Sequence, residues 1–222
     1  AIQYWRARGE ARRHRLLTMR SGYHGDTFGA MSVCDPQTGM HHLFAGILPQ
    51  QLFAPAPACQ FDEPCAEKHT REFEHLIRAH RDEIAAVVLE PVVQGAGGMR
   101  FYSPEYLRRV RELCDRHRVL LIADEIAVGL GRTGRWWACD RAGVTPDIMT
   151  AAKGLGGGFP VAAMLTTAKV AASLGVGTHG STYGGNALAC AVAPLHPTPF
   201  KPSPITSFRQ PASSTSSTSP TT

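Results

Sequence analysis

Two uninterrupted apolar runs, each ended by an acid, constrain the fold of this chain more than any other feature. They are IAAVVL at residues 84–89, followed by Glu90, and VLLIA at residues 119–123, followed by Asp124. A strand with apolar side chains on both faces is typical of a parallel sheet that helices cover on both sides. We therefore expect two buried strands, each delivering a carboxylate at its carboxyl end.

The alternation of strands and helices extends along most of the chain. Ser103, Pro104 and Glu105 combine a capping hydroxyl, a proline at the first helical position and an acid in the first turn, which predicts a helix between the two runs. Apolar patterns predict further strands at residues 16–20, 147–152 and 161–166, and helices at residues 26–34, 68–81 and from 185 onward. This alternation predicts an α/β fold with a mostly parallel sheet flanked by helices.

The last 29 residues, 194–222, differ in composition from the rest, because they hold 7 Pro, 7 Ser and 6 Thr. Such a segment has too few apolar side chains to bury a core, so we predict that it is disordered. Residues 1–8 resemble the end of a helix that lacks a start signal, so the chain is expected to begin inside a domain. The sequence therefore predicts one partial domain at residues 1–193, incomplete at both ends, followed by a tail.

Charge and composition argue against several classes of function. Charged residues make up 18% of the chain and its arginines fall in scattered helical groups, which indicates solvated faces rather than a nucleic-acid surface. No apolar run is long enough to span a bilayer and the first residues do not form a secretion signal, which favours a cytoplasmic protein without a membrane partner. The histidines lack metal-ligand spacing, and the six cysteines include no CxxC pair, so we expect no metal site and reduced, structural thiols.

Lys153 lies between an apolar stretch and a run of glycines. Burial disfavours the ammonium form, so a lysine at the end of a buried strand needs a role for its amine; the alternative is a surface lysine. Ligands bind at the carboxyl ends of parallel strands, so we expect Glu90, Asp124 and Lys153 to converge on one site. An acid for the ring nitrogen and an amine for a Schiff base are the pair that pyridoxal phosphate requires. For Asp124 the alternative is a helix cap after a strand.

Six segments together carry the resemblance to a known family. They are SGYHGDT (21–27), EP (90–91), DEI (124–126), GRTG (131–134), KG (153–154) and HGSTYGGN (179–186). On these segments the chain resembles the class III aminotransferases of fold type I over residues 1–193. The resemblance implies the large domain of a pyridoxal-phosphate-dependent transferase that takes a small-molecule amino donor and a keto acceptor. It also implies a homodimer in which both subunits build each active site.

The resemblance implies a role for each matched residue. Lys153 would bind the cofactor as a Schiff base and carry a proton between substrate and cofactor, and Asp124 would keep the pyridine nitrogen protonated. Tyr23 and Ile126 would lie against opposite faces of the ring, a role that rests on the motif, because on their own a tyrosine and an isoleucine are more often ordinary packing residues. Glu90 would line the site near the ring.

Two further residues complete the implied site. Asp26, together with Tyr23, would contact the substrate, and Thr182 would donate its hydroxyl to the phosphate of the cofactor bound in the partner subunit. Glu125 matches a position outside the chemistry and receives no role. Residues 129–134 spell GxGxxG, but no clear βαβ unit with a ribose-binding acid follows, so we do not favour a dinucleotide site.

The resemblance divides between two branches of the family. Residues 23–36, 52–57 and 94–100 resemble the branch that moves an amino group from S-adenosylmethionine to 8-amino-7-oxononanoate in biotin synthesis, giving 7,8-diaminononanoate. Residues 177–186 resemble the acetylornithine branch, which keeps acetylornithine or another ω-amino acid as an alternative substrate. The upstream match is longer and contains Asp26, so we favour the biotin branch. The family's phosphate loop and C-terminal small domain have no counterpart in the sequence, which keeps a non-catalytic fragment as the other alternative.

Overall fold

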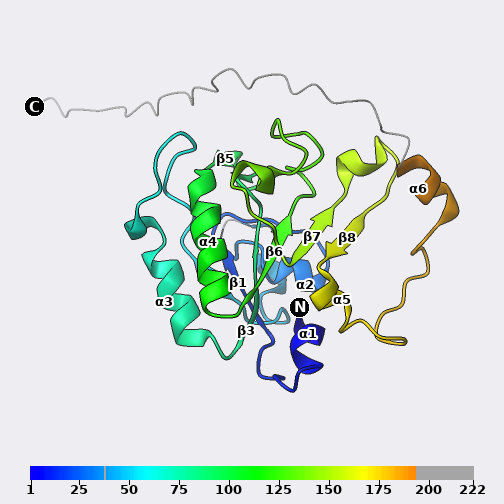
Figure 1. Cartoon of the computed structure of the whole chain (residues 1–222), viewed down its shortest axis with the longest axis horizontal. Helices are drawn as coiled ribbons and strands as arrows, with labels where there is room; N and C mark the ends of the chain where they lie inside the picture. Colours follow the sequence, from blue (N-terminus) through cyan, green and yellow to red (C-terminus); the bar gives the residue numbers. More distant parts are fainter. Residues whose placement is uncertain (38, 194–222) are drawn as a thin grey trace, which may run out of the picture.

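A six-stranded sheet forms the centre of the computed structural model, which describes residues 1–37 and 39–193 (Figure 1). The strand order is β2 (Leu52–Ala54), β1 (Arg15–Met19), β3 (Ile84–Leu89), β6 (Leu120–Asp124), β7 (Ile148–Ala151) and β8 (Ala163–Thr166). All neighbouring strands are parallel except β7 and β8, which are antiparallel. The predicted α/β fold with a mostly parallel sheet is confirmed, while the predicted tail at residues 194–222 lies outside the described residues.

The two apolar runs form the adjacent central strands β3 and β6. Every residue of β3 is buried, as its uninterrupted apolar sequence predicts. Leu89 of β3 pairs with Ala123 of β6, so Glu90 and Asp124 leave the sheet side by side. The register of these two strands therefore brings two acids that are far apart in the sequence to one edge of the sheet.

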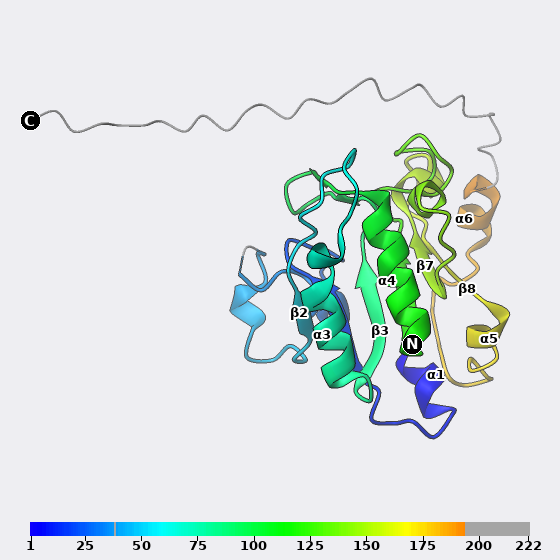
Figure 2. The same ribbon diagram turned by 60° about the vertical axis from the view of Figure 1, so that its left-hand side comes forward.

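Helices α3 (Arg71–His80) and α4 (Pro104–Arg116) cover one face of the sheet (Figure 2). Their apolar sides bury Phe73, Ile77 and Leu107 in the same core cluster as Leu17, Val87 and Leu121 of the strands. The predicted start of α4 is confirmed, since the Oγ of Ser103 accepts the backbone N–H of Glu105 at 3.4 Å and Pro104 occupies the first helical position.

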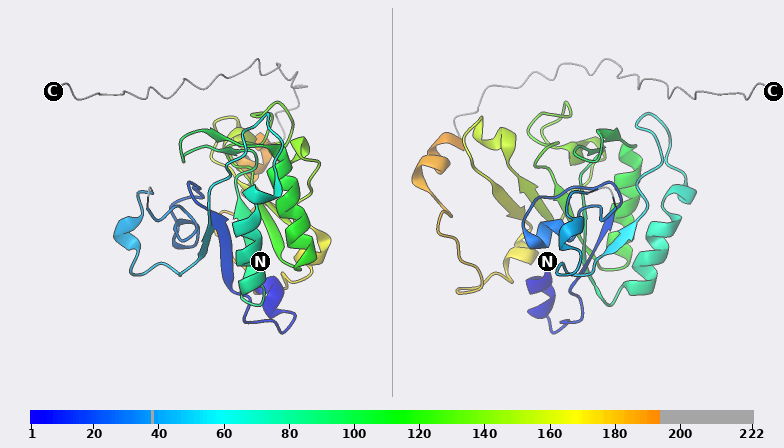
Figure 3. Two further views of the ribbon diagram at one scale, coloured as in Figure 1. Left: turned by 90° about the vertical axis from the view of Figure 1, so that its left-hand side faces the viewer. Right: turned by 180° about the vertical axis from the view of Figure 1, so that it is seen from behind.

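Two short helices, α1 (Ile2–Arg6) and α5 (Ala168–Ala171), pack against the other face (Figure 3). Trp5 inserts there, and its indole N–H donates to the backbone oxygen of Ala85 at 2.7 Å. Buried aromatic side chains need a partner for such a polar group, and β3 supplies it. Both faces of the central strands are thus covered, which is the condition for an all-apolar strand.

Several elements differ from the sequence expectation. The loop-rich stretch contains the edge strand β2, and a small antiparallel pair, β4 (Val93–Gln94) with β5 (Arg100–Phe101), follows β3. These segments are too short to show a periodic pattern. The helix expected at residues 26–34 shrinks to α2 (Phe28–Met31), and the last described helix is α6 (Ala187–Val192). Four 3₁₀ helices complete the described elements: η1 (His42–Phe44), η2 (Glu67–His69), η3 (Ala138–Arg141) and η4 (Lys153–Gly156).

The prediction that all cysteines are reduced is wrong for one pair. Cys59 and Cys65 form a disulfide, with their Cα atoms 5.4 Å apart. The loop between β2 and η2 folds back on itself, which brings together two cysteines whose spacing in the sequence matches no common motif. Cys34, Cys114 and Cys139 are free and buried, whereas Cys190 is free and exposed. No helix among residues 1–37 and 39–193 is long and apolar enough to cross a membrane.

Candidate active site

Strained backbone gathers at the carboxyl edge of the sheet. Ser21, Val92 and Lys153 follow β1, β3 and β7, and all three are non-glycine residues with a positive φ, of 63°, 55° and 48°. This conformation is uncommon outside glycine and costs free energy, most of all for the β-branched Val92. Gly97 packs so closely on the backbone of Ser21 that a side chain there would collide with it. Such strain at one edge is typical of a functional site.

Asp124 ends β6 at this edge and is buried. His24 donates from Nδ1 to Oδ2 of Asp124 at 2.8 Å, across 100 residues of sequence. Oδ1 accepts the longer bonds, from the backbone N–H of Ile126 and the hydroxyl of Thr150, both at 3.2 Å. The histidine thus holds the carboxylate from one side, and Oδ2, which accepts one hydrogen bond where Oδ1 accepts two, keeps a lone pair for a further donor.

His24 is a site residue to which the sequence analysis gave no role. Its side chain is only 4% exposed, and Nε2 is buried without a hydrogen-bond partner among the described residues. The available indication was its place in SGYHGDT, directly after Tyr23. A histidine on its own, however, is more often a packed residue, and its partner Asp124 is distant in the sequence.

Glu90 follows β3 and is 5% exposed. Its Oε1 accepts the backbone N–H of Tyr23 at 3.0 Å, and its Oε2 accepts that of Gly95 at 2.8 Å. Burial raises the pKa of Glu90, and these two backbone donors partly offset the rise. Glu90 therefore ties the segment that carries Tyr23 and His24 to the carboxyl edge of the sheet.

Tyr23, Asp26 and His41 form a hydrogen-bonded group beside this segment. The Tyr23 hydroxyl donates to Oδ2 of Asp26 at 2.8 Å, and His41 Nε2 donates to Oδ1 at 2.8 Å. The hydrogen bonds from His41 and then Tyr23 lower the pKa of Asp26, while the bond to Asp26 raises the pKa of Tyr23. His41, which also received no role from the sequence, is buried and stacks on the Tyr23 ring, with the ring centroids 6.1 Å apart. Tyr23 and Asp26, the two residues predicted to contact the substrate, are therefore hydrogen-bonded to each other.

Glu125 points away from this group into the protein. It is fully buried, and its two oxygens accept the backbone N–H groups of Ala138 and Cys139 at 2.9 and 2.8 Å. Burial raises its pKa. Glu125 thus fixes the start of the 3₁₀ helix η3, which is the next element after the GxGxxG loop at residues 129–134. A dinucleotide site needs an α-helix directly after such a loop, so this geometry argues against one.

The expectation that Lys153 is buried is wrong, because its side chain is exposed. Lys153 is exposed at the start of η4, after a strand that is buried only at its two ends, Ile148 and Ala151. No hydrogen bond or ion pair joins its amine to another residue in the described part of the chain. Its left-handed backbone turns the chain out of the sheet, so the amine lies in solvent at the carboxyl edge.

Hydrogen bonds bring some of the predicted site residues together and leave others apart. Asp124 bonds the backbone of Ile126 and the side chain of His24, and Glu90 bonds the backbone of Tyr23. Thr182 is exposed, and among the described residues no hydrogen bond or ion pair links it to this group.

Comparison with known proteins shows what this chain resembles. The aminotransferase class-III family matches residues 1–195. The adenosylmethionine-8-amino-7-oxononanoate aminotransferase of Mycobacterium leprae is 51% identical over 199 residues, which cover 87% of this chain and 45% of that protein. The protein of the same name from Corynebacterium glutamicum is 48% identical over 201 residues, covering 87% and 47%. The chain therefore spans just under half the length of these relatives.

Solved structures resemble the fold as well. The adenosylmethionine-8-amino-7-oxononanoate aminotransferase of Methanocaldococcus jannaschii superposes with a TM-score of 0.76 at 36% identity, covering 86% of this chain and 44% of that one. An amine transaminase from an uncultivated Pseudomonas species, solved in its PLP-bound form, gives 0.77 at 38% identity, covering 86% and 46%. These neighbours confirm the expected fold type. Because the family match spans most of the sequence and these relatives agree with it, the chain belongs to the class-III aminotransferase family.

Proposed function

We propose that this chain provides the cofactor-binding part of an aminotransferase that converts 8-amino-7-oxononanoate to 7,8-diaminononanoate in biotin synthesis, with S-adenosylmethionine as amino donor. The sequence match to relatives that carry this enzyme's name, at 51% and 48% identity, supports the substrate pair. The observation that carries the chemistry is the His24–Asp124 pair at 2.8 Å, on the same sheet edge as Lys153.

The residues at this edge fit pyridoxal phosphate. Asp124 is a buried carboxylate with accepting capacity left at Oδ2, which suits a protonated ring nitrogen. Lys153 carries an exposed amine without an ion-pair partner among the described residues, which suits a carbonyl ligand. Bound there, the cofactor would supply an electron-withdrawing ring that stabilises negative charge on the substrate carbon.

The residues of the chain would then divide the remaining work. The Nζ of Lys153 would hold the cofactor and, once released by the substrate, move a proton at the substrate carbon. His24 would orient the carboxylate of Asp124 through its hydrogen bond. Tyr23 and Ile126 would position the ring, Glu90 would line the site, and Asp26 would contact the substrate.

A second copy of the chain would complete the site. Thr182 is exposed and has a free hydroxyl among the described residues, so it would be available to donate to the cofactor phosphate bound in the partner subunit. We also place this reaction in the cytoplasm, because its substrates are small soluble metabolites.

Binding of the cofactor can be tested separately from turnover. When the purified chain is mixed with pyridoxal phosphate, we expect the visible absorbance band of the cofactor to shift. Lys153→Ala should abolish this shift, because only the Nζ of Lys153 is proposed to bond the cofactor's carbonyl group. Lys68→Ala removes a lysine that is exposed on η2 and serves as the matched control. A shift that survives in Lys153→Ala contradicts the proposed role of this lysine.

Turnover tests the substrate pair. The expected result is amino transfer to 8-amino-7-oxononanoate with S-adenosylmethionine and none with acetylornithine as donor. Transfer from acetylornithine instead would favour the alternative branch. Cofactor binding without any transfer would favour the non-catalytic alternative.

A further inference from the structure

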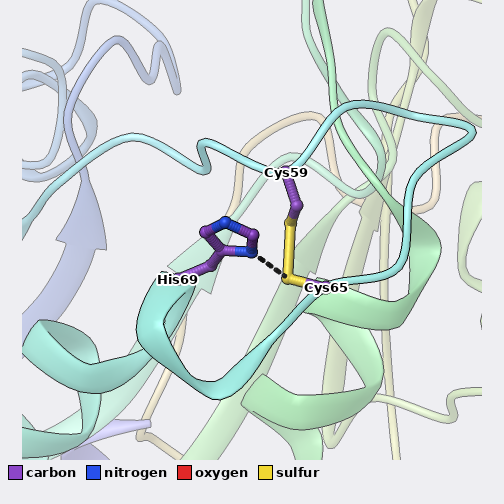
Figure 4. A group of neighbouring side chains, drawn as sticks. All are labelled: Cys59, Cys65 and His69. Carbon is purple, nitrogen blue, oxygen red and sulfur yellow. Dashed lines mark hydrogen bonds between the residues drawn. A yellow bond between two sulfur atoms is a disulfide. The ribbon is translucent and has the colours of Figure 1, made fainter.

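A group of three metal-binding side chains lies away from the proposed active site. Cys59 follows β2, Cys65 precedes η2 and His69 ends η2 (Figure 4). Their possible ligand atoms all lie within 4.8 Å of one another, and the Sγ of Cys65 is 3.7 Å from the Nδ1 of His69. Both cysteines are 1% exposed and His69 is half-buried.

This donor set matches the preferences of zinc. Zn²⁺ binds thiolate sulfur at about 2.3 Å and imidazole nitrogen at about 2.0–2.1 Å, so a tetrahedral centre separates its sulfur and nitrogen ligands by about 3.6 Å. The separation of 3.7 Å between Cys65 Sγ and His69 Nδ1 is close to that value. Two thiolates would also neutralise the dication, which lowers the cost of placing it in a buried loop.

Hydrogen bonds already hold the backbone around the three residues. The backbone oxygen of Cys59 accepts the N–H of Ser103 at 3.1 Å, and the N–H of Cys65 donates to Oε2 of Glu105 at 2.8 Å. The N–H of His69 donates to the backbone oxygen of Ala66 at 3.0 Å. The start of α4 and the turn of η2 therefore fix the positions from which the three side chains approach one another. Such outer contacts are what orient the ligands in metal sites.

We propose that the reduced pair Cys59 and Cys65, together with His69, binds a zinc ion, and that the disulfide is the oxidised, metal-free form of the same site. A disulfide holds its sulfurs about 2 Å apart, whereas tetrahedral zinc needs them about 3.8 Å apart, so the two states exclude each other. Reduction adds two electrons from a thiol or phosphine reductant and breaks the S–S bond. The two protons come from the thiol, which becomes a disulfide, or from water, whose oxygen the phosphine takes up as phosphine oxide. Zinc binding then displaces the two protons, and solvent fills the fourth position.

A zinc titration tests the proposal. The full chain is reduced with a phosphine, freed of metal and titrated with Zn²⁺ against a chromogenic chelator. One tightly bound zinc ion per chain is expected, together with the release of protons. Cys59→Ser and His69→Gln are each expected to weaken binding by more than roughly 100-fold, because loss of an outer-shell partner alone costs about 10- to 100-fold. Cys190→Ser, which removes an exposed free thiol, is the matched control and should bind as the parent does.

Two further measurements keep the result interpretable. With Co²⁺ in place of Zn²⁺, the reduced chain should show thiolate-to-metal charge-transfer absorption, which Cys59→Ser weakens and oxidation of the two thiols to the disulfide abolishes. If Cys59→Ser changes the circular dichroism spectrum, its loss of zinc could reflect misfolding. His69→Gln retains both cysteines, so its zinc affinity then tests the site. If the reduced chain binds no more zinc than His69→Gln, the proposal is wrong and the pair is a structural disulfide only.

Discussion

Two adjacent acids at the end of β6 have opposite surroundings. Asp124 is held by His24 at the carboxyl edge, whereas Glu125 points inward and accepts two backbone N–H groups. Side chains point to opposite sides from one residue to the next along a strand, so one carboxylate reaches the site and the next holds the start of η3.

Replacement of Glu125 by Gln tests that anchoring role. A neutral amide offers one oxygen and one NH₂ group, so one of the two buried N–H donors loses its acceptor. We expect the free energy of unfolding to fall by about 1–3 kcal/mol, as is usual for a buried unsatisfied group. Urea unfolding followed by circular dichroism measures the change. Glu112→Gln, at an exposed position on α4, is the control and should leave the midpoint unchanged.

Sequence reasoning located single site residues where a local pattern announced them. Glu90 and Asp124 follow apolar runs, so their place at the sheet edge could be predicted. His24 and His41 could not be assigned, because each becomes informative only through its hydrogen bond to an acid brought near by the fold. The exposure of Lys153 was also missed, because the strand before it is buried only at its ends.

At the scale of elements, the start of α4 shows how a local pattern is converted into stability. Ser103 is 4% exposed, and its Oγ accepts the N–H of Glu105, which otherwise has no partner in the first turn of the helix. The same turn carries Glu105, whose carboxylate holds the backbone of Cys65. The start of α4 therefore stabilises both the core and the loop that carries Cys59 and Cys65.

Removal of the cap is expected to destabilise the fold. Ser103→Ala should lower the free energy of unfolding by about 1 kcal/mol, within the range of 0.5–2 kcal/mol typical of helix caps, because an N–H at the helix start loses its acceptor. Thermal unfolding measures the effect. Thr27→Ala is the matched control, since Thr27 precedes α2 without a side-chain capping bond. Equal losses in both variants would contradict a role for the Ser103 hydroxyl.

The antiparallel edge strand β8 and the short strand β2 show the limit of prediction at this scale. Apolar content predicted a strand near β8, but not its direction, because direction depends on the short turn through η4 that returns the chain beside β7. Strand β2 has only three residues, and its pairing with β1 rather than its own sequence defines it.

Across the whole molecule, buried carboxyl groups make stability depend on pH. Burial raises the pKa of Glu90 and Glu125 above the value of 4.5 in the unfolded chain. The folded protein therefore binds these protons more tightly, so the free energy of unfolding falls as the pH rises from 4.5 through the raised values. Asp26 and Glu83 have the opposite effect on the free energy of unfolding, because their pKa values are lowered in the folded state. The stability that they contribute is present above the unfolded-state pKa and is lost as the pH falls through the lowered values.

A single substitution isolates the contribution of Glu90 to this pH dependence. Glu90→Gln carries no titrating carboxyl group, so we expect its free energy of unfolding to decline less than that of the parent between pH 4.5 and neutrality. Denaturant unfolding at a series of pH values gives the two slopes. Glu72→Gln, an exposed substitution on α3, corrects for the change in net charge. Parallel pH profiles for Glu90→Gln and the parent would show that the burial of Glu90 does not govern this dependence.

The sequence by itself determined the central strands, the helix that Ser103 begins, and the family to which the chain belongs, because each depends on residues that are close together in the chain. Only the tertiary structure decided which side chains meet. The bonds from His24 to Asp124, from the backbone of Tyr23 to Glu90 and between the sulfurs of Cys59 and Cys65 join segments through loops whose paths no local pattern specifies. Hydrogen bonds and metal ligation require contact in space, and that contact is set by how strands and loops pack together.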